Sequence, residues 1–140
     1  MGLPEELLRH QLVAENDCQD PSILPSMAKC MRGLVDHYYP LRSIGVPWKE
    51  IYEFAAAAYR MGRNRFDAKL AQQPFPKWAL MYDQIPKDVY DYVSGSRDSV
   101  VWDYRDWAWF DRNYKPPKKG AGLWALLLAA LAVGLIWKKK

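Results

Sequence analysis

The chain has 140 residues, which is enough for one small domain, and its net charge is +4. All sixteen acidic residues and fourteen of the twenty basic residues precede Lys115, so residues 1–114 carry a net charge of −2. The other six basic residues are lysines that flank an apolar run near the C-terminus. The positive charge therefore belongs to the flanks of that run, and it gives no support to nucleic-acid binding.

The N-terminal region predicts a short helix over residues 4–14. Pro4 suits the first turn, where its missing N–H costs nothing, and Glu5 and Glu6 suit the positive end of the helix dipole. The apolar face of this helix consists of Leu7, Leu8 and Leu12. Residues 15–25 are polar and interrupted by proline, so we expect a loop there.

A second helix is predicted to begin at Ser26, which can cap its N-terminus, and to end at Pro40. Its apolar residues recur at helical spacing: Met27, Cys30, Met31, Leu34, Val35 and Tyr38. Ser26 also forms a Ser-x-x-Lys pattern with Lys29. The companion motifs of penicillin-binding enzymes do not occur, so we interpret Ser26 as a cap.

The longest helix of the body is predicted over residues 47–71. Its apolar stripe consists of Trp48, Ile51, Tyr52, Ala55, Ala58 and Tyr59, and Phe66 and Leu70 continue it. The alanines at 55–58 let a partner helix approach closely, whereas Gly62 is expected to weaken the helix locally. The opposite face is basic and carries Arg60, Arg63, Arg65 and Lys69.

Prolines divide the following region into short pieces. Residues 77–84 predict a helical turn or more, and Pro86 begins a short helix that Gly95 ends. Residues 98–114 predict another helix, with a strand as the alternative for its aromatic run.

Aromatic side chains crowd the end of the body. The stretch from residue 102 to residue 114 contains Trp102, Tyr104, Trp107, Trp109, Phe110 and Tyr114. A domain of this size is not expected to bury all of them in one core. Tryptophan and tyrosine are enriched at bilayer surfaces and at protein interfaces, so we expect this segment at a membrane surface or against a neighbouring protein. The alternative is ordinary core packing under the helix of residues 47–71.

Residues 121–137 form an uncharged apolar run that predicts a single transmembrane helix. Such a run must be helical in lipid, and at 1.5 Å per residue it spans roughly 26 Å, the short end for a bilayer. Its flanks carry lysines and two tryptophans at headgroup level: Lys115, Lys118, Lys119, Trp124, Trp137, Lys138, Lys139 and Lys140. A buried helix of a soluble protein is the alternative, but charged clusters at both ends suit headgroups better.

Small residues follow one face of this apolar run. They are Gly122, Ala125, Ala129 and Ala132, at spacings of three, four and three. Small residues let helices pack closely in lipid, so we predict a helix-packing face here. The alternative is that alanine and glycine are merely common in membrane helices.

The sequence contains no recognisable catalytic or metal-binding pattern. Neither His10 nor His37 has a carboxylate or cysteine at ligand spacing, and the neighbouring Asp36 predicts a surface pair with His37. The seven aspartates between residues 83 and 111 lack the alternating spacing of a calcium loop. Cys18 and Cys30 do not match a zinc motif; a disulfide and two free thiols both remain open. We therefore expect no enzyme activity, no metal, no cofactor and no small-molecule substrate.

The expected fold is mainly α, with a small irregular body of four to five short helices and one C-terminal transmembrane helix. Residues 1–114 form the body at the membrane surface, with its aromatic-rich part at 98–114. A basic linker (115–120), the transmembrane helix (121–137) and a lysine tail (138–140) follow. Because three lysines stand on each side of the run, charge does not orient it in the membrane.

The chain resembles, in type, the small accessory subunits of mitochondrial inner-membrane complexes such as respiratory complex I, cytochrome oxidase and ATP synthase. The shared features are short length, many Trp, Tyr and Pro residues, one membrane span and no catalytic motif; no single motif carries the likeness. The resemblance implies a non-catalytic structural or assembly subunit whose partners are other subunits and the lipid bilayer. The alternative is a tail-anchored adaptor of the mitochondrial outer membrane or endoplasmic reticulum that recruits a soluble partner.

Overall fold

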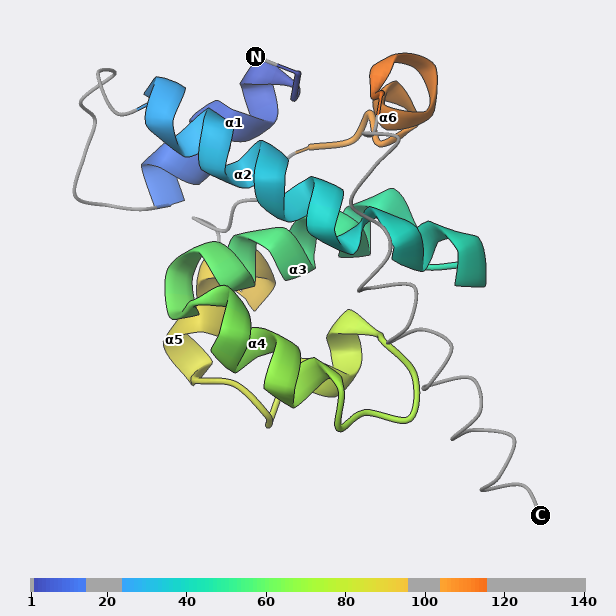
Figure 1. The fold of residues 1–140 in the computed structure, drawn as a ribbon. Coiled ribbons are helices and arrows are strands. Elements are labelled where there is room, and N and C mark those ends of the chain that lie inside the picture. The colour runs from blue at the N-terminus through green and yellow to red at the C-terminus, as the bar shows by residue number, and fades with distance from the viewer. Residues whose placement is uncertain (1, 15–23, 96–103, 116–140) are drawn as a thin grey trace.

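A computed structural model of the chain describes residues 2–14, 24–95 and 104–115 (Figure 1). The six α-helices are α1 (Glu5–Ala14), α2 (Leu24–Tyr38), α3 (Trp48–Met61), α4 (Arg63–Leu70), α5 (Lys87–Tyr90) and α6 (Ala108–Asn113). Short 3-10 helices η2 (Tyr39–Ile44) and η3 (Trp78–Met81) and a π-helical turn η4 (Asp91–Gly95) complete them. Within these ranges there is no strand, which confirms the mainly α prediction.

The predicted transmembrane helix at 121–137 lies outside the described residues, as do residues 116–120 of the linker and the lysine tail. In the part of the chain that the structure describes, no helix combines the length and the apolar character needed to cross a bilayer.

Helix α3 forms the centre of the body. Every side chain from Ile51 to Ala58 is buried, because α2, α4, α5 and the short helices η2, η3 and η4 all pack around it. The alanines at 55–58 present a narrow surface, which lets neighbouring helices approach. The sequence predicted one apolar stripe on this helix, but Phe54 and Glu53 on its other sides are buried as well.

The prediction of a single helix over 47–71 is wrong in one respect, because the chain forms two helices there, α3 and α4, that are separated at Gly62. The backbone of Gly62 has φ 98°, ψ 133°, and its N–H still donates to the carbonyl of Ala58 at 2.9 Å. A side chain would be strained at this φ, so glycine allows the chain to turn sharply. As a result α4 runs back beneath α3 (Figure 1), and Phe66 and Leu70 reach the core while Arg63 stays exposed.

The two N-terminal helices pack as an apolar pair. Leu7, Leu8 and Leu12 of α1 are buried, as predicted. Helix α2 already includes Leu24 and Pro25, so the prediction of Ser26 as its N-cap is wrong. Cys30 is exposed instead of belonging to the apolar stripe, whereas Ala28, on nearly the opposite side of the helix, is buried.

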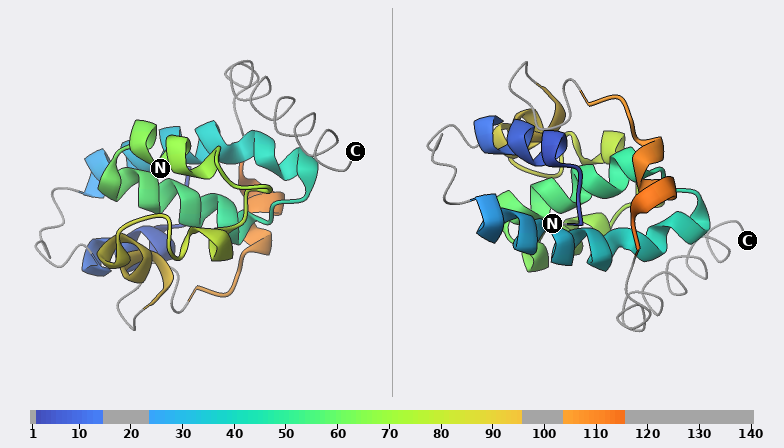
Figure 2. Two further views of the ribbon diagram at one scale, coloured as in Figure 1. Left: turned by 90° about the horizontal axis from the view of Figure 1, so that it is seen from below. Right: turned by 90° about the horizontal axis from the view of Figure 1, so that it is seen from above.

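The predicted helix over 98–114 is wrong in extent. Residues 98–103 lie outside the described part, Tyr104 to Asp106 have no helical structure, and α6 covers only Ala108–Asn113. Tyr104 and Phe110 are six residues apart, so a continuous helix would turn them about 120° away from each other. The break before α6 allows both rings to be buried. Figures 1 and 2 show α6 at the end of the body where α2 leads into η2 and α3 begins.

Candidate functional site

The C-terminal end of the body is fastened to α2 by two side chains of that helix. Arg32 and Asp36 are one turn apart and therefore share a face. The hydroxyl of Tyr114 donates a hydrogen bond to Asp36. Arg32 donates to the backbone carbonyl of Lys115 at 3.2 Å, and its guanidinium lies 5.5 Å from the centre of the Tyr114 ring. We call these four residues the clamp.

The electrostatics of the clamp keep the proton of the Tyr114–Asp36 bond on the phenol. Burial raises the pKa of Tyr114, and the hydrogen bond to Asp36 raises it further. Burial also raises the pKa of Asp36 from its usual value, although the hydrogen bond from Tyr114 and the charge of Arg32 oppose this. The resulting bond joins a neutral donor to a carboxylate acceptor, which is stronger than a bond between two neutral groups.

An aromatic cluster holds α6 against the start of α3. Trp48 stacks on Phe110 with ring centres 4.8 Å apart, and Tyr114 meets Trp48 edge-on at 5.3 Å. The indole N–H of Trp48 donates to Asp111 at 2.8 Å. The guanidinium of Arg42 lies over the Trp48 ring at 5.5 Å and pairs with Asp111 at 3.6 Å. Trp48 therefore joins ring stacking, a hydrogen bond and a cation–π contact at one place.

The aromatic residues predicted as interface residues divide into two groups. Tyr104, Phe110 and Tyr114 are buried within the chain's own core, as core packing under α3 requires. Trp107 and Trp109 are only partly buried and pack against that core, so they keep surface that a partner can contact. Trp102 lies outside the described residues. A role in an interface stays a prediction for these two partly buried indoles.

Of the predicted membrane flank and packing residues, only Lys115 is described, and its side chain is exposed. The residues that lie outside the described part are Lys118, Lys119, Gly122, Trp124, Ala125, Ala129, Ala132, Trp137, Lys138, Lys139 and Lys140.

A second polar cluster joins α2 to α4. The prediction that His37 pairs with Asp36 is wrong: its Nε2 lies 2.8 Å from Oδ2 of Asp67, thirty residues away. The hydroxyl of Tyr38 donates to Oδ1 of the same carboxylate at 2.5 Å. Burial and the charge of Asp67 raise the pKa of Tyr38, so it remains a donor. This cluster binds the two helices to each other.

Two polar side chains lie in the interior. Gln11 is fully buried, and its amide accepts from the hydroxyl of Tyr52 at 2.5 Å and donates to Tyr92 at 3.1 Å. It thereby links α1, α3 and η4. Glu53 is 4% exposed, and burial raises its pKa to about 8. The sequence did not predict that Gln11 and Glu53 are buried. Each stands beside an apolar position, but the apolar stripe predicted for its helix was too narrow to include it.

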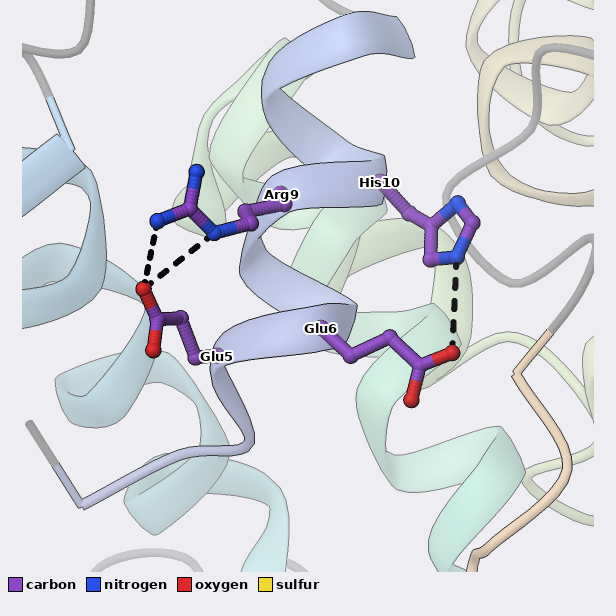
Figure 3. Close-up of a pocket in the computed structure, with 4 residues that line it drawn as sticks. All are labelled: Glu5, Glu6, Arg9 and His10. Atoms are coloured by element: carbon purple, nitrogen blue, oxygen red, sulfur yellow. Dashed lines mark hydrogen bonds and ion pairs between the residues drawn. The ribbon is translucent and has the colours of Figure 1, made fainter.

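A shallow pocket of about 560 Å³ lies along α1 and is shown in Figure 3. Its described lining residues are Glu5, Glu6, Arg9 and His10, all from this helix. Arg9 pairs with Glu5 at 2.6 Å, and His10 lies 3.9 Å from Glu6. These side chains thus pair along the helix itself, and the expectation that His10 has no carboxylate partner is wrong, because Glu6 lies one turn earlier.

Among residues 2–14, 24–95 and 104–115, no three His, Cys, Asp or Glu side chains gather as metal ligands would. Cys30 has a free thiol, and Cys18 lies outside the described residues.

Comparisons with known proteins identify no relative. No family model matches the chain, and no curated protein or solved structure is significantly similar to it.

Proposed function

We propose that the chain is a non-catalytic, single-pass accessory subunit of a mitochondrial inner-membrane complex of the respiratory chain or ATP synthase. In this proposal residues 121–137 cross the membrane, and the helical body lies at its surface. The apolar run with lysines on both flanks carries the proposal. The type resemblance described above supplies the mitochondrial assignment.

The clamp supports a scaffolding role. It fixes Lys115, the first residue of the basic linker, to the middle of α2. Only the five residues 116–120 then separate the body from the proposed membrane helix. A body attached through so short a linker stays close to the bilayer, where it can contact neighbouring subunits on the same surface.

The use of the titratable side chains agrees with a structural role. His37 and Asp67 join α2 to α4, Asp36 fastens Tyr114, and His10 pairs along α1. His37, Asp67 and Asp36 thus contact other elements of the body, and His10 contacts a residue of its own helix. We therefore propose that the contribution of the chain is binding and positioning.

A tail-anchored adaptor is the second candidate, and two observations favour it. The body buries most of its aromatic residues in its own core, as an independently folded domain does. It also exposes large apolar side chains on the η3 region, where Phe75, Leu80 and Tyr82 are 37%, 37% and 63% exposed. In this alternative the exposed side chains bind a soluble partner.

Extraction of the chain from mitochondria in mild detergent, followed by a native gel and mass spectrometry, distinguishes the two candidates. A subunit co-migrates with a very large assembly, whereas an adaptor migrates as a small species. Migration as a small species in several mild detergents contradicts the subunit proposal.

Resistance to alkaline carbonate tests the membrane helix separately. We expect the wild-type chain to stay in the membrane and Leu128→Arg to be released, because a central arginine costs about 2.5–3.5 kcal/mol of insertion free energy. Release of the wild-type chain contradicts the membrane helix.

A further inference from the structure

A second pocket, of about 360 Å³, lies beside the clamp. The N-terminal segment and the first half of α2 form it, and its described lining residues are Gly2, Pro25, Ala28, Lys29 and Arg32. Two of these side chains are cationic and none is acidic. Lys29 is exposed and makes no ion pair with another described residue, so its charge is available to a ligand.

Arg32 is held in position at the wall of this pocket. The guanidinium donates to the carbonyl of Lys115 and covers the ring of Tyr114. Gly2 lies so close that a Cβ at this residue would stand 1.8 Å from Nη1 of Arg32. A guanidinium has five N–H donors, so it retains others after the bond to Lys115.

The carboxylate of Asp36 does not cancel this charge by a direct ion pair. Asp36, one turn along α2, accepts the hydrogen bond of Tyr114, and its influence on Arg32 is that of a nearby charge. A fixed guanidinium beside a free ammonium suits a phosphate group, because the planar fork of arginine matches phosphate oxygens.

The pocket lies next to the point where the chain leaves the body. Arg32 touches Lys115, and the proposed membrane helix begins six residues later at Ala121. Six fully extended residues reach at most about 20 Å. The pocket is therefore within reach of the headgroup layer wherever the membrane helix begins.

We propose that Lys29 and Arg32 bind the phosphate of an anionic lipid headgroup and thereby orient the body on the bilayer. This inference rests on the proposed membrane helix. It adds a lipid-binding site and assigns the ligand as an acidic phospholipid. A zwitterionic phospholipid carries a cation in its headgroup that compensates the phosphate charge, so it is expected to bind more weakly than an acidic phospholipid.

The test uses the full chain in a neutral mild detergent with equal amounts of phosphatidylglycerol and phosphatidylcholine, and native mass spectrometry counts the lipids retained. We expect preferential retention of phosphatidylglycerol, and Lys29→Gln is expected to reduce it about fivefold, as the loss of one membrane-facing charge does. Arg32→Lys keeps the charge but removes the fork, so a smaller reduction is expected.

Lys69→Gln is the charge-matched comparison, since Lys69 is exposed on α4 and does not line the pocket. An equal reduction in Lys69→Gln and Lys29→Gln overturns the proposal, because the net charge of the body then attracts the lipid. Displacement of the lipid by millimolar inorganic phosphate also overturns it, since the ligand is then free phosphate. Lipid binding in detergent does not require that the chain inserts into a bilayer. Release of the wild-type chain by alkaline carbonate would therefore refute the membrane helix, while the number of lipids retained in detergent would stay the same.

Discussion

The hydroxyl of Tyr114 donates a hydrogen bond to the carboxylate of Asp36, which lies seventy-eight residues earlier in the chain. This bond closes the body, because it joins the segment after α6 to the middle of α2. Arg32 reinforces it from the preceding turn of α2. The C-terminal end of the described body is therefore held against the middle of α2, beside the linker to the proposed membrane helix.

Tyr114→Phe is expected to lower the free energy of unfolding by about 1–2 kcal/mol, because it leaves the partly buried Asp36 without its donor while preserving the ring packing. Thermal unfolding of the full chain in mild detergent, followed by circular dichroism, measures this. The matched control is Tyr82→Phe, whose side chain is 63% exposed. Equal melting temperatures for the two variants would show that the bond to Asp36 contributes nothing.

Glu53 is expected to make the body less stable as pH rises. Burial raises its pKa from 4.5 to about 8, with the charge of Glu50 adding to the effect and that of Lys49 opposing it. The folded state therefore binds the proton more tightly than the unfolded state. The corresponding stability is complete below pH about 4.5 and is lost progressively as pH rises to about 8.

Glu53→Gln removes this titration while keeping a similar shape. We expect the variant to exceed the wild type in unfolding free energy by about 2–4 kcal/mol at pH 9 and by much less at pH 5. Chemical denaturation at both pH values measures the difference, and comparison with the wild type cancels the contribution of Asp36. A difference that is the same at both pH values refutes the assignment to Glu53. Glu5→Gln, on the exposed face of α1, provides the control.

Asp67→Asn is expected to destabilise the body by about 1–3 kcal/mol, because His37 and Tyr38 both lose their carboxylate partner. Asp83→Asn, at an exposed position, is the control.

His37→Ala is expected to reduce assembly of the host complex in proportion to the stability lost with the His37–Asp67 contact. Turnover per assembled complex should remain that of the wild type, and a large loss of turnover in fully assembled His37→Ala complex would instead make His37 a catalytic residue.

Ala125→Leu combined with Ala129→Leu is expected to weaken retention of the chain in its complex. In the proposed membrane helix these positions would be about one turn apart, and large side chains there would push a neighbouring helix away. Leu127→Ala combined with Leu131→Ala is the matched control, since lipid tails adapt to either side chain. Co-purification of the chain with the assembly in mild detergent gives the retained fraction. If both double variants are retained equally, the helix serves as an anchor alone.

Periodicity predicted the local structure well where one face of a helix meets the core. The residues predicted as helices over 4–14 and 27–38 form α1 and most of α2. Leucines and methionines at helical spacing lie on one face of a helix, and only that face has to be buried against the core. Prolines and glycines likewise located the pieces around residues 77–95. The failures occur where a tertiary contact overrides the local pattern. Gly62 turns the chain so that Phe66 reaches the core, and the break before α6 buries Tyr104 together with Phe110.

The candidate site shows the same division. The lysine-flanked apolar run and the concentration of aromatic residues near it are properties of the sequence, and they suffice to propose a membrane helix. The pairing of Tyr114 with Asp36, of His37 with Asp67 and of Arg32 with Lys115 was decided only by the tertiary structure. Each pair joins residues at least thirty positions apart, and a carboxylate or guanidinium carries no sign in the sequence of which distant partner it meets. Hydrophobic burial depends on periodic patterns that one segment contains by itself, whereas these polar contacts depend on how the packed helices bring separate segments together.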